Sequence, residues 1–600
     1  MTTITPKIIA QIKKYRQFIW LALILLSAIF VYKDCLQAGL VNWDDGGQVT
    51  NNRDIQELSP AGIIKIFRSF YLGMYQPLVT GGYALEYHLV QAQPWLYHLD
   101  NLLLHLLNIV LVWLLTKQLF KKDSPALLSS AIFAVHPLVL ESVAWVSARS
   151  TLLFAGFYLL AMLFYLKYLK QGQLRYYWLV ILSFTLSLLA KPLAVTLPVV
   201  LCLLDYYRQR PLNKKLFLDK IPLFALSIIF GLVATRSRET YFIANQDSYI
   251  YSWPNKIAVW LYSLGDYIEK LILPNHLSTF YAFPEQIQGW LPWHIYAVAV
   301  GFLALSGLLI KFRSNKTLIF LGLFYLANLA LTVQIKLFSR TVIADRYAYL
   351  AGLAVIWLMA LAYAKIIAAK PQYKIIINVI VIIYCLMLGA ITMNRLPVWQ
   401  NNLIFWQRAV DEYPNDSFAL SALGGAYYEL KLLDQALIYS EKSIKIHNRN
   451  SDALSKLGTI YFDKQDYRRA IDYYNRAITI NNGKSIYYYN RACAIAGLGD
   501  QRGALIDYEL ALKFSQSSDQ YLDDYYLALA NTKYKLGDYA GAVTAYDTAI
   551  ALVKDPAEAY FFRGLSKLNL QNKTEGCQDI AQAGKLEYKD AQRDYNKLCQ

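Results

Sequence analysis

The sequence is poor in charged residues. Asp, Glu, Lys and Arg make up 17% of its 600 residues, whereas an ordinary soluble protein has about 25%. Hydrophobic residues make up 56%, and many stand in uninterrupted runs of about twenty, the length that spans a bilayer. This composition excludes a chain of several ordinary soluble domains and indicates an integral, multi-pass membrane protein.

Several motifs of known chemistry are missing. The 6 cysteines form no C-x-x-C pair, so the spacing of a zinc site or a thiol redox site is absent. The sequence also has no Gly-rich phosphate loop, no H-E-x-x-H and no G-x-S-x-G. ATP binding by this chain is therefore not indicated. A disulfide between Cys577 and Cys599 is permitted, but the sequence does not determine it.

The positive charge is confined to the first two thirds of the chain. Residues 397–600 carry 24 Lys and Arg against 25 Asp and Glu, so residues 1–396 carry the remaining 35 and 17. Cytoplasmic loops of membrane proteins are rich in Lys and Arg, whereas nucleic-acid binding needs a basic face on a soluble domain. We therefore expect no nucleic-acid partner.

Eleven apolar segments are predicted to span the membrane, and the first is predicted to be a retained helix rather than a cleaved signal. Segments 75–91 and 256–272 are ambiguous because they contain charged side chains, each costing about 2.5–3.5 kcal/mol at the bilayer centre. The predicted spans are 17–33, 97–119, 126–143, 145–168, 176–190, 193–207, 219–235, 293–311, 317–335, 344–366 and 373–393.

Clusters of Lys and Arg between the spans set the orientation. If all of them face the cytoplasm, eleven spans suffice, segment 256–272 does not cross, and the chain after the last span lies on the opposite side. If that segment crosses, the last two clusters lie outside, so the rule favours eleven spans. Two outer loops, 34–96 and 236–292, then share the non-cytoplasmic face.

From residue 397 onward the pattern changes to a repeat of 34 residues. In the second unit, Gly458 and Ala470 are the small residues that let two paired helices approach each other, which is the tetratricopeptide (TPR) signature. The last unit has Gly576 where the others have Ala, which suits a capping repeat. The sequence predicts a TPR α-solenoid with units at 417–450, 451–484, 485–518, 523–556 and 557–590.

Two adjacent carboxylates, Asp44 and Asp45, stand in the first outer loop. They are candidates for a general base or for metal ligands. The alternative is a solvated turn, since Asp-Asp-Gly-Gly is good turn chemistry. The pair permits a divalent metal ion without requiring one, and no other cofactor is indicated.

The predicted span 97–119 carries polar residues on one helical face. His98, Asn101 and His105 follow at steps of three and four residues. Polar groups in a span face the bundle interior or a wet cavity, and the alternative is hydrogen bonding between helices. Two histidines without a thiolate argue against zinc.

Three cations are expected near the outer ends of spans: Arg149, Lys191 and Arg346. Together they could hold an anionic phosphate, because arginine offers a bidentate grip. The alternative for each is snorkelling at the interface or an ion pair with a neighbouring acid. The polar residues expected to support the site are His98, Asn101, His105, His136, Glu141 and Asp345.

An ordered set of motifs resembles a known family. The motifs are Asn42-Trp43-Asp44-Asp45, YHLDNLLLH at 97–105, His136-Pro137 followed by ESVAWVSAR at 141–149, PNHLS at 274–278 and ADRYAYL at 344–350. With the repeats that follow, this set resembles the transmembrane and TPR O-mannosyltransferase family and its bacterial relatives. These are similar to the protein O-mannosyltransferases, integral membrane glycosyltransferases of the GT-C fold.

The resemblance implies an all-α protein, with a GT-C-like transmembrane bundle at 1–396 and a TPR solenoid at 397–600. It implies inverting transfer of a sugar from a polyprenyl-phosphate donor to a hydroxyl of a protein or glycan on the non-cytoplasmic face. Asp44 matches the family's proposed base, with Asp45 beside it, and Arg149 and Arg346 match the arginine expected near the carrier phosphate, with Lys191 in support. The repeats would bind an acceptor or partner on their concave face. A bacterial inner membrane, with the repeats in the periplasm, is the expected location.

Two other functions stay open. A non-catalytic, membrane-anchored TPR scaffold could organise an envelope complex through peptide binding. A transporter of lipid-linked sugars would need a site near the bilayer midplane and discontinuous helices. The placement of the carboxylates and cations on the outer face favours the transferase over the transporter.

Overall fold

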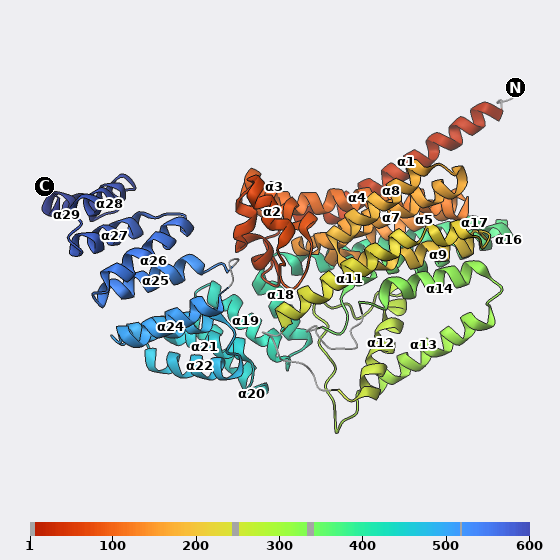
Figure 1. Ribbon diagram of the computed structural model, residues 1–600. Helices are drawn as coiled ribbons and strands as arrows, with labels where there is room; N and C mark the ends of the chain where they lie inside the picture. The colour runs from red at the N-terminus through yellow and green to blue at the C-terminus, as the bar shows by residue number, and fades with distance from the viewer. Residues whose placement is uncertain (1–5, 243–250, 333–340, 516–518, 600) are drawn as a thin grey trace. The chain divides into compact units, whose positions relative to one another are not determined.

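The computed structural model describes residues 6–242, 251–332, 341–515 and 519–599. Every regular element in these ranges is helical, and the extended structure they contain is limited to two isolated bridges. The chain divides into two compact units, the first ending at Glu412 and the second running from Tyr413 to the C-terminus. The all-α fold class predicted from the sequence is confirmed (Figure 1).

Unit 1 is a bundle of long apolar helices with short helices between them. They are α1 (Pro6–Tyr32), α2 (Pro60–Arg68), α3 (Pro77–Val90), α4 (Pro94–Phe120), α5 (Asp123–Val135), α6 (Leu140–Ala144), α7 (Arg149–Gln171), α8 (Leu174–Ala190), α9 (Leu197–Tyr207), α10 (Lys214–Leu218), α11 (Ile221–Phe242), α12 (Trp253–Ile272), α13 (Trp293–Lys311), α14 (Lys316–Leu329), α15 (Ala348–Ala351), α16 (Leu353–Ala369), α17 (Lys374–Arg395) and α18 (Asn402–Glu412). The 3₁₀ and π turns are η1 (Lys33–Gln37), η2 (Gly46–Thr50), η3 (Arg53–Gln56), η4 (Pro137–Val139), η5 (Val146–Ala148), η6 (Pro192–Thr196), η7 (Asp345–Tyr347), η8 (Pro371–Tyr373) and η9 (Leu396–Trp399).

Six helices in the described residues are long and apolar enough to cross a membrane, or up to 8 if each of two bent pairs is one span. Three shorter apolar helices, α8, the stretch Pro192–Tyr207 and α14, coincide with three further predicted spans. The count of eleven therefore remains a prediction. The ambiguous segments correspond to α3 and α12, and neither is among the candidate spans. Residues 333–335 of one predicted span and 243–250 of the second predicted outer loop lie outside the described residues.

The helices differ in how much of their surface other helices cover. In the span that includes α7, 67% of the most apolar window is buried, whereas the value for α13 is 17%. Helix α7 packs against both α4 and α8, and α4 also packs against α5. The polar face of α4 is therefore enclosed in the bundle, and α13 presents most of its apolar surface to the surroundings.

The segment after the last predicted span packs with the bundle rather than with the repeats. In α18, the ring of Phe405 lies 5.0 Å from Trp399 and 5.5 Å from Trp43 of the first outer loop. Apolar burial of these rings accounts for the unit boundary after Glu412. The sequence pattern placed the boundary earlier, at residue 396, where the apolar runs end.

Unit 2 consists of five helical hairpins and a terminal helix, in agreement with the five predicted TPR units. The hairpins are α19 (Ser417–Glu429) with α20 (Leu433–Ile446), α21 (Ser451–Asp463) with α22 (Tyr467–Ile480), α23 (Ser485–Gly497) with α24 (Gln501–Phe514), α25 (Leu522–Lys535) with α26 (Tyr539–Leu552) and α27 (Ala557–Asn569) with α28 (Lys573–Lys585), followed by α29 (Ala591–Leu598). A Cβ at Gly458 would lie 2.6 Å from the ring of Tyr474 on the paired helix, which explains the small residue of the repeat.

The last repeat departs from the others for a steric reason. A Cβ at Gly576 would lie 2.9 Å from the carbonyl oxygen of Gly564, and a Cβ at Gly564 would lie 2.7 Å from that of Gly576. The two helices are therefore closer than an alanine at either position allows. Cys577 and Cys599 form a disulfide that joins α28 to the end of the chain.

Candidate active site

The two acidic residues of the first outer loop have different surroundings. Asp45 is 1% exposed, and its carboxylate accepts hydrogen bonds from the N–H groups of Val41 at 2.8 Å and Ser147 at 2.9 Å, and from the Ser147 hydroxyl. Asp44 is half-buried, and among the described residues its side chain has no hydrogen-bond partner. Asp45 therefore fixes the loop, whereas the Asp44 carboxylate makes no hydrogen bond in the described part of the chain.

Both carboxylates are weaker acids than usual. Burial raises the pKa of Asp44 to about 6, while the nearby Arg346 cation opposes the shift and Glu141 adds to it. Burial raises the pKa of Asp45 to about 7 against the hydrogen bonds from Ser147 and Val41. At neutral pH most of Asp44 is ionised, yet it binds a proton more strongly than an ordinary aspartate. This is the property expected of a general base.

Arg346 lies in η7, at the start of a bent helix pair, and is fixed by Glu141. Its backbone N–H donates to Oε2 of Glu141 at 2.8 Å, and its Nη1 donates to Oε1. The guanidinium carbon lies 5.8, 5.1 and 5.0 Å from the ring centroids of Trp43, Trp145 and Tyr347. Arg346 keeps part of its surface exposed. The cation is thus held in place by Glu141 and three aromatic rings, and one of these rings belongs to Trp43, the neighbour of Asp44.

Lys191 approaches the same region from the turn between α8 and η6. Its Nζ donates to Oγ1 of Thr151 at 2.8 Å and lies 5.8 Å from the ring centroid of Tyr347. Burial, together with the nearby Arg346 cation, lowers the pKa of Lys191 to about 7, while Glu141 opposes the shift. An anion bound between the two cations would favour the protonated lysine.

Stacked indole rings form a wall beside these charges. The ring of Trp145 lies 5.4 Å from that of Trp43 and 6.0 Å from that of Trp399, with interplanar angles of 29° and 28°. Trp145 precedes Ser147, the residue that holds Asp45. Packing of large rigid rings at these distances fixes the loop on which Asp44 stands.

Arg149 is placed differently from the other two predicted phosphate ligands. It is 1% exposed, and its guanidinium donates to Oδ1 of Asn101 at 2.9 Å, to the carbonyl of Tyr97 at 2.8 Å and to Glu86. A second acid, Asp100, lies 3.5 Å away. In the described part of the chain, Arg149 shares no hydrogen-bond partner with Lys191, which donates to Thr151, or with Arg346, which donates to Glu141. Its donors join α3, α4 and α7, which favours a positioning role.

The polar residues of α4 form hydrogen bonds with other parts of the bundle, which is the second of the two interpretations given above. Asn101 donates to the carbonyl of Trp145 at 3.0 Å, and His98 Nε2 lies 3.3 Å from the carbonyl of Gly39. His105 Nδ1 lies 2.9 Å from the hydroxyl of Tyr349. All three predicted residues are buried. They hold the turns that carry Trp145 and Tyr349 rather than facing an open cavity.

The remaining predicted residues hold the elements around Arg346. Asp345 pairs with Arg395 at 3.0 Å and accepts a hydrogen bond from Tyr281 at 2.7 Å. The Arg395 guanidinium also donates to the carbonyl of Ser278 at 2.9 Å. His136 Nε2 lies 3.1 Å from the carbonyl of Leu271. These contacts fix η7 against the second outer loop, so they set where Arg346 lies.

The site therefore has an accessible part and a supporting part. Trp43, Asp44, Lys191, Arg346 and Tyr347 are all half-buried and lie together. The buried residues that surround them are Asp45, His98, Asn101, His105, His136, Glu141, Arg149 and Asp345. Among the described residues, no group of three or more His, Cys, Asp or Glu side chains is placed to hold a metal ion.

Sequence reasoning missed four residues of this site. Trp43, Trp145 and Tyr347 stand inside the motifs used above, but their aromatic character was not linked to a cation. The sequence did contain an indication of their role, because each of these aromatic residues is next to or near a predicted charged residue. Arg395 had no such signal, because its partner Asp345 is fifty positions earlier and only the fold brings them together.

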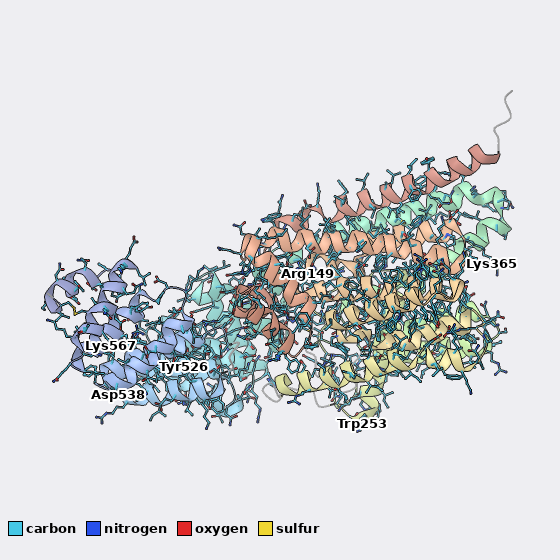
Figure 2. The ribbon with its side chains drawn as sticks, turned by 45° about the horizontal axis from the view of Figure 1, so that its top comes forward. Arg149, Trp253, Lys365, Tyr526, Asp538 and Lys567 are labelled. Carbon is cyan, nitrogen blue, oxygen red and sulfur yellow. A yellow bond between two sulfur atoms is a disulfide. The ribbon has the colours of Figure 1, made fainter. Side chains whose placement is uncertain are left out.

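The site lies toward one end of the bundle. Figure 2 shows Arg149 near the end that carries the first outer loop and Lys365 at the opposite end. Lys365 belongs to the last of the basic clusters predicted to face the cytoplasm. Arg149 and Lys365 are therefore at different ends of the bundle.

Comparisons with known proteins agree with this architecture. Residues 83–236 match the family model described as dolichyl-phosphate-mannose-protein mannosyltransferase, and residues 451–483 and 527–584 match tetratricopeptide repeat models. The chain combines a mannosyltransferase-related membrane region with tetratricopeptide repeats. The resemblance expected from the ordered motifs is confirmed. The mannosyltransferase-related region includes Arg149 and Lys191, whereas Asp44 and Arg346 lie on either side of it.

The curated relatives are named protein O-mannosyl-transferases. One from Caenorhabditis elegans, F38B6.6, is 28% identical over 43% of this chain and 39% of its own. Human TMTC1 is 31% identical over 25% of this chain and 18% of its own, and human TMTC3 is 30% identical over 22% and 15%. The matched region thus spans well under half the length of these relatives.

Two solved structures are similar to part of this chain. YrrB, described as a TPR protein with an unusual peptide-binding site, is 15% identical with a TM-score of 0.29, over 32% of this chain and 98% of its own. PilF of Pseudomonas aeruginosa is 15% identical with a TM-score of 0.30, over 40% of this chain and 97% of its own.

Proposed function

We propose that this protein is a membrane glycosyltransferase that moves a sugar from a polyprenyl-phosphate donor to a hydroxyl of a protein or glycan on the non-cytoplasmic face. The observation that carries the proposal is that the Arg346 guanidinium lies 5.8 Å from the ring centroid of Trp43, the residue before Asp44, and that the Arg346 cation lowers the pKa of Asp44 against the effect of burial. A carboxylate able to accept a proton and a fixed cation able to bind phosphate are the two groups this transfer needs. The names of the relatives support the reaction class.

The proposed reaction is a single inverting displacement. Asp44 removes the proton of the acceptor hydroxyl as its oxygen bonds to C1 of the sugar. The bond between C1 and the phosphate oxygen breaks, and its electron pair leaves with the polyprenyl phosphate. Arg346 and protonated Lys191 stabilise the charge on that phosphate, because they are fixed before the charge develops.

Two observations support a non-cytoplasmic site. Arg149, one of the residues that surround the accessible part of the site, is at the end of the bundle away from Lys365 (Figure 2), and clusters of Lys and Arg favour the cytoplasm. In addition, Cys577 and Cys599 form a disulfide in unit 2. Disulfides persist mainly in oxidising compartments such as the periplasm. By the eleven-span topology, unit 2 follows the last span on that same side.

The repeats are proposed to bind the protein acceptor or a partner. Stacked TPR hairpins form an extended concave surface that takes peptides, and five hairpins are present here. A protein acceptor held there would raise the local concentration of its hydroxyls near the membrane.

The test is transfer of radiolabelled sugar from polyprenyl-phosphate donors by the purified full-length chain, with membrane extract as acceptor. Polyprenyl-phosphate mannose is the first donor to try, because the relatives are named for mannosyl transfer. Asp44→Asn should abolish transfer at unchanged expression. Asp34→Asn is the matched control, because Asp34 is an exposed acid ten positions earlier.

Activity that survives Asp44→Asn would contradict the assignment of the base. Absence of transfer from every donor, with the protein folded, would contradict the transferase and favour the membrane-anchored scaffold. Uptake of a lipid-linked sugar across vesicles without transfer would favour the transporter.

A further inference from the structure

A tight turn between α12 and α13 presents two large apolar side chains to the outside. Ile287 and Trp290 exchange backbone hydrogen bonds of 2.9 and 3.0 Å across the turn. Between them, Gln288 and Gly289 have φ values of 52° and 85°, the left-handed pair of a type I′ turn. Ile287 is 73% exposed and Trp290 is 70% exposed. Turns usually carry polar residues, so this tip needs an explanation.

The turn is held by specific hydrogen bonds. Asn255 of α12 donates to the carbonyl of Gly289 at 2.9 Å, and its own Oδ1 accepts a hydrogen bond from Tyr296 of α13 at 2.8 Å. The Tyr296 hydroxyl accepts one from the N–H of Leu291 at 3.2 Å. Both flanking helices therefore fix the backbone, and the direction of Ile287 and Trp290 is set by the fold.

The turn also rests on a small core of its own. Its members are Tyr251, Ala258, Val259, Phe283, Leu291 and Ile295. These buried residues fill the space beneath the turn, so Ile287 and Trp290 point away from a core that is already packed.

Further exposed tryptophans continue the apolar surface. Trp253, the first residue of α12, is 66% exposed, and Trp293, the first residue of α13, is 79% exposed. Figure 2 shows Trp253 at the edge of unit 1. Helix α13 is a candidate span with little of its apolar surface covered, and it begins three residues after Trp290. Tryptophan is the residue enriched at membrane–water interfaces.

Charge is sparse in the segment that carries the turn, although Lys256 of α12 lies 5.3 Å from the ring centroid of Trp253. Between residues 271 and 310 the one charged residue, histidines aside, is Glu285. An interface with a soluble protein usually has a polar, charged rim, and binding to anionic headgroups would need lysine or arginine. An uncharged, tryptophan-rich tip beside a span is suited to the interfacial zone of a bilayer.

We propose that the turn around Ile287 and Trp290, with Trp253 and Trp293 beside it, inserts into the membrane–water interface of the leaflet where α13 begins. The bound partner is the lipid surface in which the protein is embedded. Insertion is driven by burial of apolar area, so it does not depend on anionic lipid. This assignment is independent of the proposed glycosyl transfer.

Insertion would also connect the lipid surface to the candidate active site, a consequence that rests on the proposed function. The segment that carries the turn includes Tyr281, whose hydroxyl donates to Asp345 at 2.7 Å, and Asp345 precedes Arg346. An anchored segment would keep η7 at a fixed depth relative to the headgroups. That is useful to an enzyme whose donor phosphate lies at the same depth.

The test is a depth measurement on the full-length chain in nanodiscs of phosphatidylcholine. A spin label is attached to Gln288→Cys in a background in which Cys35, Cys202, Cys385 and Cys493 are replaced by alanine. Its collision rates with oxygen, which concentrates in lipid, and with a neutral nickel chelate, which stays in water, are compared. The matched control is Gln571→Cys, an exposed glutamine with left-handed φ in a turn of unit 2.

The oxygen-to-nickel ratio should be several-fold higher at position 288 than at position 571. It should fall toward the control when Ile287→Ser and Trp290→Ser are added. Equal ratios at the two positions would overturn the proposal, because the turn would then lie in water. Protection from both reagents would also overturn it, since a protein partner would then cover the turn.

A second measurement applies if the background without the four free cysteines does not fold. A photo-crosslinking amino acid in place of Gln288 in the otherwise native chain should attach phospholipid, detected by mass spectrometry of the peptide. Crosslinks to protein would overturn the proposal, and so would the absence of any lipid crosslink. Neither measurement uses sugar transfer, so failure of the anchor and failure of the proposed function give different results.

Discussion

The Asp45 carboxylate accepts hydrogen bonds from both the N–H and the hydroxyl of Ser147. These bonds join the first outer loop to the turn that leads into α7. The two residues are 102 positions apart in sequence. Asp44, the neighbour of Asp45, takes no part in this contact. The arrangement separates two carboxylates that look alike in the sequence, because the Asp45 side chain holds the loop and the Asp44 side chain is the proposed base.

Replacement of Asp45 by Asn should destabilise the protein, whereas the same change at Asp44 should not. An amide has one acceptor oxygen, so Asp45→Asn loses hydrogen bonds from Ser147 or Val41, at a cost of about 1–3 kcal/mol. The measurement is thermal unfolding of both variants in the same detergent. A lower Tm for Asp45→Asn and an unchanged Tm for Asp44→Asn are expected. The reverse order would contradict the two roles.

Sugar transfer should have a narrow, bell-shaped dependence on pH. Asp44 acts as a base when ionised, so kcat/KM should rise as the pH increases through about 6. Lys191 binds phosphate when protonated, so kcat/KM should fall as the pH increases through about 7. Initial rates at low donor concentration between pH 5 and 9 would measure both limbs.

The alkaline limb can be assigned by substitution. Arginine stays protonated over this range, so Lys191→Arg should remove the fall above pH 7 while leaving the acid limb in place. A bound phosphate also favours protonated Lys191, so the alkaline limb of kcat should lie at higher pH than that of kcat/KM. An alkaline limb unchanged by Lys191→Arg would show that another group causes it.

The two arginines should respond differently to replacement by lysine. Arg149→Lys loses the planar contacts with Asn101 and the carbonyl of Tyr97, so it should lower the Tm with little change in donor KM for the folded fraction. Arg346→Lys keeps a charge but loses bidentate geometry, and it should raise donor KM about tenfold, equivalent to about 1.4 kcal/mol. A KM change at Arg149 as large as at Arg346 would place Arg149 in the phosphate site.

The sequence pattern predicted the elements that depend on local periodicity. The 34-residue repeat is visible because each hairpin buries the same small residues, such as Gly458 against Tyr474. Apolar runs likewise locate α4, α7, α13 and α17, since one long run specifies one span. Both features are encoded within a few dozen residues, so they need no knowledge of the tertiary fold.

The contacts that set the site are long-range and could not be predicted. Arg395 pairs with Asp345, and Glu141 with Arg346, across 205 positions in the second case. Side chains of either charge are common near the ends of spans, so many pairings satisfy the sequence equally well. The charge pattern indicated which residues were candidates. Only the fold shows that the Arg149 guanidinium donates its hydrogen bonds to Glu86 and Asn101.

Loss of the disulfide should destabilise the end of the solenoid without affecting the bundle. Cys577 and Cys599 close a loop with a sequence separation of 22, for which the chain-entropy model gives about 3 kcal/mol. Cys577→Ser combined with Cys599→Ser should speed hydrogen exchange in α28 and α29, and Cys493→Ser is the matched control because that thiol is free. Exchange in α4 and α7 should stay the same. Faster exchange in the bundle as well would show that the disulfide stabilises more than the last repeat. Unchanged exchange in α28 and α29 would show that the disulfide does not stabilise the terminal helix.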